Sequence, residues 1–575
     1  LLTESVQAAY AKKGEQVVAA NLNAIAKTAD ALRRVDVPPE WAELPDTPDD
    51  APQSAVEAFM RPMLRQQGDM LPVSAMDARG FAPLGTSRLE KRGIARQIPQ
   101  WRAEACIQCG LCSLVCPHGC IRTFYPLAET AFPVDFHTVR AKGKALSGRN
   151  FRVQVSPLDC TGCENCARVC PAKDKALVMR SAAEMAKEQE NWNFAVSLPE
   201  TAIGEADTIP LSQAKTPLFE FSGACAGCGE TPYIKLLTQL FGSHLMIANA
   251  TGCSSIYAGS APSCPYTVNQ KGQGVAWGNS LFEDNAEFGF GMYLAMKHRR
   301  AHLAEQVETL AAQCPELAES CRAWLNNRED TALSAQAGKA LLAACETLSH
   351  PLMKEIADSA DLLAAKSVWL IGGDGWAFDI GFGGLDHVLA SGEKVRVLVL
   401  NTQVYSNTGG QASKATPAGA AARLMSGGKS GAEKDLGLMA MTYGHVYVAQ
   451  VAMGANPNQL LKAMREAEAW DGAALIIAYA PCIAHGIDMR DVQEIEKKAV
   501  QCGYFPLYRY HPANGLMLDS KAPDGDFQAF LMRQGRFAAL RRSDPAKSET
   551  LCKMAEEAAQ RRWNLLKMLK NREMP

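Results

Sequence analysis

Long hydrophobic runs and an excess of charge of either sign are both missing from this sequence of 575 residues. Apolar stretches such as 474–480 are much shorter than a membrane span, and the first residues show no basic-then-apolar signal pattern. Acidic and basic side chains nearly cancel to a net charge of −2, which removes the electrostatic case for nucleic acid or an anionic membrane as partner. We therefore expect a soluble, cytoplasmic protein of about three domains.

The segments of the chain differ in composition. Short apolar runs alternate with helical stretches in the last and longest segment, a pattern typical of a parallel sheet covered by helices on both faces. Strands are predicted at 245–250, 367–373, 395–402, 446–452 and 474–480, and a mostly helical stretch at 291–366. The predicted segments are a helical tail of a preceding domain (1–45), a linker (46–100), a cysteine-rich domain (101–185), a second linker (186–215) and the sheet domain (216–575). Because the tail has no opening methionine, the chain is expected to start inside something larger.

Cysteine is the most informative residue type here. Disulfides suit short secreted chains, whereas 19 cysteines in a long chain without a signal pattern indicate metal or redox chemistry. Twelve fall into groups with ligand spacing. The other seven are interpreted as small buried hydrophobes, with Cys120 and Cys264 standing close to ligand groups. These seven are Cys120, Cys264, Cys314, Cys321, Cys345, Cys502 and Cys552.

Two cysteine runs, "CIQCGLCSLVC" at 106–116 and "CTGCENCARVC" at 160–170, share one spacing and are each followed by proline. In this bacterial two-cluster ferredoxin pattern, the fourth cysteine of each run completes the cluster of the other run. The first [4Fe–4S] cluster is therefore assigned to Cys106, Cys109, Cys112 and Cys170. The second is assigned to Cys160, Cys163, Cys166 and Cys116. Zinc sites are the alternative, but zinc gives no reason for the third cysteine or the proline. The predicted fold is thus α/β: a doubly wound, mostly parallel sheet with an inserted 2[4Fe–4S] bacterial ferredoxin-like domain.

Two predicted strands end in polar residues on either side of a helix. The first runs into "GDG" at 373–375, and 25 residues later the second ends at Asn401-Thr402. A right-handed crossover would place Asp374 and Thr402 on one rim of the sheet, where open α/β sheets bind ligands. Their oxygens, with a main-chain carbonyl near Val404, could hold a Mg²⁺ that also binds diphosphate, and Gly373 and Gly375 would let the backbone approach. This spacing looks like the thiamine diphosphate motif.

A third cysteine group lies in the same domain. It comprises "CAGCG" at 225–229, Cys253 in "NATGCSS" and Cys482 in "YAPCIAHG". Cys253 and Cys482 each follow a predicted strand, so Cys225, Cys228, Cys253 and Cys482 could meet on the rim expected to hold the diphosphate. We predict a third [4Fe–4S] cluster there.

In this combination the sequence resembles the carboxy-terminal half of pyruvate:ferredoxin (flavodoxin) oxidoreductase. The resemblance covers essentially the whole chain. It includes "YAKKGEQVVAAN" at 10–21, "LPVSAM" at 71–76, the two cysteine runs, "CAGCGETPY" at 225–233, "GDGWAFDIGFGGLDHVLASGE" at 373–393 and "VYSNTGGQASKATP" at 404–417. The resemblance implies that Asn407 faces the reacting carbon and that Glu230 lies near the cofactor, although Glu230 could also cap the following helix. Many relatives have acidic residues in place of Asn401 and Gln403, which predicts a changed local charge.

The family performs oxidative decarboxylation of pyruvate with coenzyme A to acetyl-CoA and CO₂. By the resemblance, thiamine diphosphate with Mg²⁺ acts on pyruvate, and electrons pass through three [4Fe–4S] clusters to ferredoxin or flavodoxin. The family has substrate-gripping residues and much of the coenzyme A surface in amino-terminal domains that have no counterpart here. The chain is therefore expected to be an incomplete enzyme alone, completed in cis or by a separate subunit, and a homodimer.

Three alternatives remain open. The substrate could be another 2-oxoacid, because the selecting residues are absent. The chain could be an electron-transfer subunit that is inactive without its amino-terminal partner domains, or a zinc-stabilised interaction protein. His485, close to Cys482, is interpreted as a surface or cluster-neighbour histidine and not as a catalytic base.

Overall fold

The computed structural model describes residues 1–11, 14–43, 52, 54–201, 203–204, 206–260, 263–345 and 350–571. The chain divides into two compact units, Leu1–Ser54 and Ala55–Pro575. The first unit contains α1 (Leu2–Tyr10), α2 (Glu15–Ala31) and the short 3₁₀ turn η2 (Pro39–Ala42), all mostly exposed to solvent. In neither unit is a described helix both long enough and apolar enough to cross a membrane.

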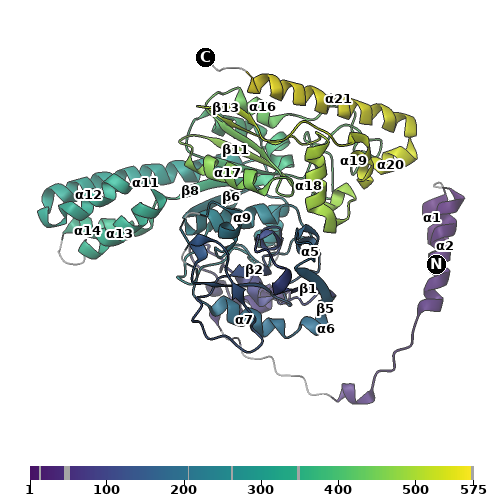
Figure 1. Cartoon of the computed structure of the whole chain (residues 1–575), viewed down its shortest axis with the longest axis horizontal. Helices are drawn as coiled ribbons and strands as arrows, with labels where there is room; N and C mark the ends of the chain where they lie inside the picture. Colours follow the sequence, from purple (N-terminus) through teal and green to yellow (C-terminus); the bar gives the residue numbers. More distant parts are fainter. Residues whose placement is uncertain are drawn as a thin grey trace. The chain divides into compact units, whose positions relative to one another are not determined.

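An eight-stranded sheet forms the centre of the second unit (Figure 1). The six strands from β10 to β7 in the order below are parallel, and β12 and β13 add an antiparallel edge. The order is β13 (Gly515–Leu518), β12 (Tyr508–His511), β10 (Tyr447–Val451), β11 (Ala474–Tyr479), β9 (Arg396–Asn401), β8 (Ser367–Gly373), β6 (Leu245–Asn249) and β7 (Ala276–Asn279). The predicted α/β fold with a parallel sheet is confirmed, and all five predicted strands are present within a residue or two.

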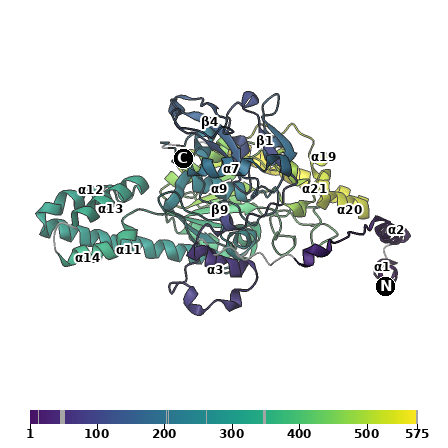
Figure 2. The same ribbon diagram turned by 90° about the horizontal axis from the view of Figure 1, so that it is seen from below.

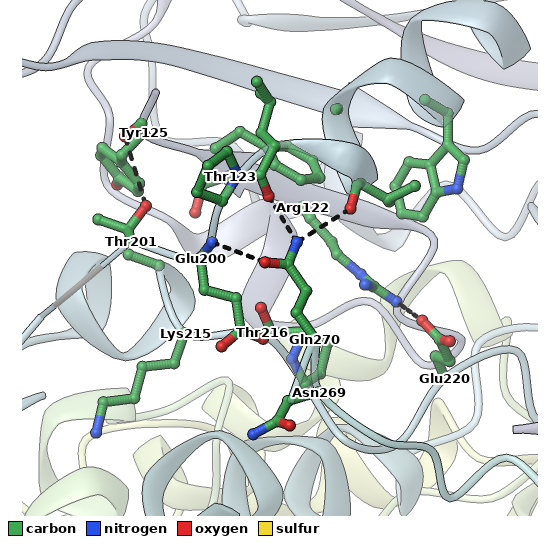
Figure 3. Close-up of a pocket in the computed structure, with 18 of the residues that line it drawn as sticks. Arg122, Thr123, Tyr125, Glu200, Thr201, Lys215, Thr216, Glu220, Asn269 and Gln270 are labelled. Carbon is green, nitrogen blue, oxygen red and sulfur yellow. Dashed lines mark hydrogen bonds and ion pairs between the residues drawn. The ribbon is translucent and has the colours of Figure 1, made fainter. Parts of the chain in front are cut away.

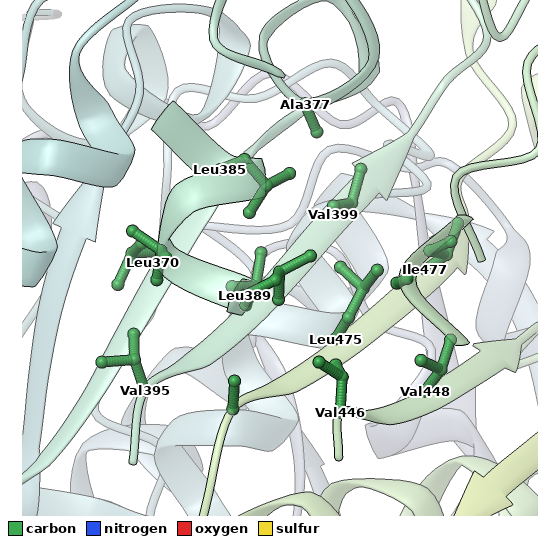
Figure 4. Packing of buried hydrophobic residues seen from close by; sticks show 14 of the residues in the cluster. Leu370, Ala377, Leu385, Leu389, Val395, Val399, Val446, Val448, Leu475 and Ile477 are labelled. Carbon is green, nitrogen blue, oxygen red and sulfur yellow. The ribbon is translucent and has the colours of Figure 1, made fainter. Parts of the chain in front are cut away.

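Both faces of this sheet are buried, because alternate side chains along each strand belong to different cores. On β8, Val368 and Leu370 enter one core, and Trp369 and Ile371 enter the other. Figure 4 shows the first core, where α15 packs over strands β8 to β11. The helices on that face include α11 (Asn285–Gln313), α15 (Phe382–Ala390), α16 (Leu436–Met441), α18 (Val492–Gln501), α19 (Phe527–Met532), α20 (Gly535–Ser543) and α21 (Pro545–Lys570). The opposite face is covered by α9 (Thr231–Phe241) and α17 (Pro457–Ala469).

A helical arm interrupts the alternation of strands and helices, as the sequence predicts. It consists of α11 (Asn285–Gln313), α12 (Ala318–Asn327), α13 (Thr331–Cys345) and α14 (Pro351–Asp358), which extend from the sheet in Figures 1 and 2. Its apolar side chains continue the first core of the sheet and include Trp324, which is fully buried and donates from its indole nitrogen to the Leu363 carbonyl over 2.8 Å.

The cysteine-rich segment is built on two small antiparallel sheets. One pairs β1 (Gln97–Trp101) with β5 (Leu177–Ser181), and the other has β4 (Asn150–Val155) between β2 (Ile121–Phe124) and β3 (Val139–Arg140). The α-helices of the second unit that precede α9 in the chain are α3 (Ala55–Leu64), α4 (Leu111–Leu114), α5 (Asn165–Val169), α6 (Ala182–Met185), α7 (Glu188–Ser197) and α8 (Ile209–Gln213). Leu114 and Val115 belong to the same buried cluster as α9, so this segment packs on the α9 face of the large sheet.

Candidate functional site

The two cysteine runs fold into loops that each open a short helix. A residue with positive φ precedes each helix, Gly110 at 73° before α4 and Glu164 at 63° before α5. Glycine adopts this conformation freely, whereas glutamate adopts it only under constraint from its surroundings. Each tight turn brings the first three cysteines of its run together at a helix start.

The structure brings the last cysteine of each run to the other run. Burial raises the pKa of Cys109, and the thiols of Cys170 and Cys106 nearby add to the effect. Burial likewise raises the pKa of Cys112, next to the same three thiols. The second set shares one cavity, lined by Cys116, Cys160, Cys163 and Cys166. Both sets have the composition predicted from the spacing, while their ligand roles stay predictions.

The number of thiols with ligand spacing in each set, four, equals the number that an iron–sulfur cube takes. Among the described residues, no three His, Cys, Asp or Glu side chains are placed to hold a single metal ion. A cube instead takes one thiolate at each of four separated irons. The buried Tyr125 hydroxyl lies near Cys112, Cys106 and Cys109 and interacts with the Thr123 side chain.

The predicted magnesium ligands converge at the carboxyl ends of β8 and β9. The Asp374 side chain is fully buried, and its Oδ1 accepts hydrogen bonds from the Thr402 amide and lies 3.0 Å from the Thr402 hydroxyl. That hydroxyl is also 3.0 Å from the Val404 carbonyl oxygen. Burial raises the pKa of Asp374 to about 6, against the hydrogen bonds from Ser413 and Thr402. Three oxygens of the kind that Mg²⁺ prefers therefore meet at one buried point.

The third cysteine group lies next to this point. The Cβ of an alanine at Gly229 would be 2.6 Å from the Pro481 carbonyl, so the loop of Cys225 and Cys228 packs directly on the loop of Cys482. The Glu230 carboxyl interacts with the thiols of Cys228, Cys253 and Cys482, and Asp374 in turn interacts with Glu230. The third cysteine group thus shares one edge of the sheet with the oxygens of Asp374, Thr402 and Val404, which we call the oxygen cage.

Glu230 is buried and does not cap α9 with its side chain. Its Oε2 accepts a 3.0 Å hydrogen bond from the Tyr257 hydroxyl. Burial raises the pKa of Glu230 to about 7, and the nearby Asp374 carboxyl adds to the shift. Glu230 is therefore held between the cysteine group and Asp374, while its place beside a bound cofactor stays a prediction.

Two contacts join the second cysteine group to the third. The buried His118 ring lies between the Thr161 hydroxyl, at 3.3 Å from Nδ1, and the Ala224 carbonyl, at 3.0 Å from Nε2. The Gly227 amide hydrogen-bonds to the Cys163 thiol. A Cβ on Gly227 would meet the Met489 carbonyl at 2.5 Å, so this close approach needs a glycine.

Several residues of the site were missed by the sequence reasoning. Ser413 donates to Asp374 Oδ2 over 2.5 Å, and the Ser406 hydroxyl is 3.1 Å from the Cys253 sulfur. The surface alternative for His485 is wrong, because this residue is fully buried and its Nε2 is 2.6 Å from the Thr402 carbonyl. Both serines lie in the stretch 404–417 that carries the resemblance, which is the signal that could have identified them.

The residues after β9 are placed differently from one another. Asn407 is exposed on the loop beyond Val404, so its side chain is free to face a ligand at this edge. Gln403 is buried, and its Oε1 accepts from the Tyr504 hydroxyl at 2.6 Å and from Arg536 Nη2 at 2.8 Å. The neutral Gln403 side chain is therefore held by a tyrosine and an arginine.

A separate cavity of about 360 Å³ lies beside the cysteine-rich segment and is lined by none of the predicted site residues (Figure 3). Arg122 pairs there with the buried Glu220, which also pairs with Arg88. Gln270 closes another side, donating to the Leu198 carbonyl over 2.7 Å. These contacts connect residues far apart in the sequence and have a structural role.

Known proteins match this chain along its whole length. Family models match at 42–95 ("domain of unknown function"), 105–173 ("4Fe-4S dicluster domain") and 356–478 ("thiamine pyrophosphate enzyme, C-terminal TPP binding domain"). The pyruvate:ferredoxin oxidoreductase of Moorella thermoacetica is 51% identical over 99% of this chain and 50% of its own length. The chain is related to the pyruvate oxidoreductases. The pyruvate-flavodoxin oxidoreductases of Klebsiella pneumoniae and Trichormus variabilis are 46% and 45% identical over 98% and 99% of this chain, again over 50% of their own lengths.

The chain therefore spans about half the length of the curated relatives it matches. The family matches at 105–173 and 356–478 confirm the predicted 4Fe–4S dicluster domain and thiamine diphosphate-binding domain. A solved 2-oxoglutarate:ferredoxin oxidoreductase from Magnetococcus marinus overlaps only weakly, with 16% identity and a TM-score of 0.28 over 46% of this chain and 65% of that one.

Proposed function

We propose that this chain is the cluster- and thiamine-binding, carboxy-terminal half of a pyruvate:ferredoxin or pyruvate-flavodoxin oxidoreductase. The observation that carries the proposal is the shared sheet edge. Asp374, Thr402 and Val404 meet there within hydrogen-bond distance, and Glu230 links them to the third cysteine group. The relatives named for pyruvate oxidation support the choice of substrate.

The oxygen cage would hold the cofactor's diphosphate through Mg²⁺. Asp374, the Thr402 hydroxyl and the Val404 carbonyl would be the protein ligands, with Ser413 orienting the carboxylate through Oδ2. Thiamine diphosphate, when bound, supplies a nucleophilic carbon and an electron sink for the decarboxylation of a 2-oxoacid. The Gly373–Gly375 turn lets the backbone approach, and Asn407 is exposed on the following loop to orient the substrate.

Three [4Fe–4S] clusters would carry single electrons away from this site. Cys225, Cys228, Cys253 and Cys482 would hold the cluster nearest thiamine. The other two would be held by the dicluster segment, which we propose as a ferredoxin-like domain at 101–185 inserted between the tail and the sheet domain at 216–575. His118 and the Gly227 amide fix the gap between the second and third groups.

The complete reaction would convert pyruvate and coenzyme A to acetyl-CoA, CO₂ and a proton, and pass two electrons to ferredoxin or flavodoxin. Half of the relatives' length lies outside this chain. We propose that the missing part supplies the substrate-gripping residues and much of the coenzyme A surface, in cis or as a separate subunit. The assembled enzyme would be a cytoplasmic homodimer.

The cofactor site is tested by thiamine diphosphate binding to the anaerobically purified chain with Mg²⁺. We expect one bound thiamine per chain, and we expect Asp374→Asn to abolish binding without loss of iron. Asp471→Asn is the matched control, because Asp471 is 93% exposed. Equal binding by Asp374→Asn would overturn the assignment of the site. The substrate is tested in a fusion of this chain with the remaining half of the Moorella relative. This fusion should reduce a viologen dye when pyruvate and coenzyme A are added. Dye reduction with a different 2-oxoacid but not with pyruvate would contradict the assignment of pyruvate as the substrate.

A further inference from the structure

The cavity of the second cysteine group contains one thiol too many. Besides Cys116, Cys160, Cys163 and Cys166, it is lined by Cys120, which neither the spacing pattern nor the comparisons assign. One [4Fe–4S] cluster takes four thiolates, one for each iron. The fifth thiol therefore has a different role or none.

Cys120 is held close to the proposed ligand Cys116. Their sulfurs are 3.5 Å apart, and the Cys120 side chain is 3% exposed. The residue stands just before β2, and its carbonyl accepts a 2.7 Å hydrogen bond from the Ser156 amide. Between the two cysteines the Gly119 amide bonds back to the Cys116 carbonyl and its φ is 61°, which closes the turn. The backbone therefore fixes the contact between the two sulfurs.

The direction of the hydrogen bond follows from the chemistry. A cysteine that binds iron does so as a thiolate, which accepts hydrogen bonds and donates none. Only Cys120 can then supply the proton in the contact between the two sulfurs. Hydrogen bonds to cluster sulfurs stabilise their negative charge and are among the factors that set a cluster's reduction potential.

We propose that Cys120 is a non-ligating positioning residue of the second cluster, whose S–H donates to Cys116 Sγ and makes that cluster easier to reduce. The proposal rests on the proposed function, because it requires the second cluster. Such a donor would favour the transfer of electrons to the second cluster. His118, which contacts the Ala224 carbonyl beside the third cysteine group, lies next to this cluster.

The test is an EPR-monitored redox titration of the cluster-loaded chain and two variants. Cys120→Ala removes the donor, and Cys120→Ser replaces S–H by the O–H donor of nearly the same shape. We expect unchanged iron in both. In Cys120→Ala the equilibrium constant for reducing one cluster should fall about tenfold, the effect of losing one hydrogen bond to an anion. This change lowers the reduction potential of that cluster by about 59 mV for one electron. Cys120→Ser should restore the potential at least partly.

Cys552→Ala is the matched control. Cys552 is also buried, at 2% exposure, and its sulfur contacts Ser548 on α21 and no cluster ligand. Its three potentials should equal those of the wild type. The shifted signal in Cys120→Ala should be the one that disappears in Cys163→Ala.

Three results would overturn the proposal. An unchanged potential in Cys120→Ala would show that the thiol makes no effective hydrogen bond. Loss of about four irons in Cys120→Ala would show that Cys120 is itself a ligand. A wild-type chain without iron would remove both this proposal and the proposed function, so the wild-type iron content separates a failure of the general account from a failure of the role of Cys120.

Discussion

Replacing Thr402 by valine tests the oxygen cage with little change in shape. The substitution keeps the side-chain volume but removes the hydroxyl that lies 3.0 Å from Asp374 Oδ1 and 3.0 Å from the Val404 carbonyl. The position is 1% exposed, so water cannot easily replace the lost oxygen. The hydroxyl is both a proposed Mg²⁺ ligand and a partner of a buried carboxylate.

The expected loss follows from the charge of the groups involved. An interaction of a hydroxyl with a charged group contributes about 2 kcal/mol, which corresponds to a dissociation constant about 30-fold weaker. Titration of thiamine diphosphate into the anaerobic, cluster-loaded chain at fixed Mg²⁺, followed by calorimetry, measures this constant. Raising Mg²⁺ should recover part of the affinity, because the lost oxygen belongs to the metal site.

Thr402→Ser is the matched control, since it keeps the oxygen and loses only a methyl group. Its affinity should lie within about threefold of the wild type. Wild-type affinity in Thr402→Val, with the iron content unchanged, would refute the assignment of this hydroxyl to the magnesium site.

Other substitutions test packing and charge. Burial raises the pKa of Glu496 to about 8, so the folded chain keeps a proton that the unfolded chain releases near pH 4.5. The free energy of unfolding should therefore fall as pH rises from about 4.5 to 8. Thermal unfolding of Glu496→Gln, measured against pH, should lose this part of the dependence. An unchanged dependence would contradict the role of this acid. Gly229→Ala places a Cβ 2.6 Å from the Pro481 carbonyl, and this variant should lose about four of about twelve bound irons. The control Gly291→Ala has open space around its Cβ and should lose no iron. Equal iron content in both variants would contradict the packing of the third cysteine group. Glu220→Gln breaks two ion pairs of a carboxylate that is 2% exposed. The free energy of unfolding, measured by thermal unfolding, should fall by about 3 kcal/mol. A melting temperature equal to that of the wild type would contradict the stabilising role of these ion pairs.

Strands and strand ends were predictable because the sheet is buried on both faces. Continuous apolar runs such as β9 and β11 can bury both of their faces only between two layers of helices. The polar residues that follow them then had to lie on one edge, which placed Asp374, Thr402 and Cys482 together. The strands β7 and β13 form the two edges of the sheet and are mostly half-buried or exposed, whereas β12 is buried. All three have only four residues and so gave no comparable signal.

Contacts between distant segments were beyond the sequence reasoning. His485 is placed by the packing of the loop after β11 against Thr402, and its sequence neighbours alone gave no sign that it is buried. The Cys120 sulfur reaches Cys116 because one tight turn and one strand fix both residues, while a fifth cysteine outside the spacing pattern reads as an ordinary buried residue. Local spacing therefore predicted the composition of the groups, and tertiary packing determined their neighbours.

The most direct test of the account is the cofactor content of the chain purified without oxygen. Iron, acid-labile sulfide and thiamine diphosphate bound with Mg²⁺ are measured per chain on the same sample. The account predicts about twelve irons with equal sulfide, from three four-iron clusters, and one thiamine diphosphate. Zinc in place of iron, or fewer than about four irons without bound thiamine, would contradict it.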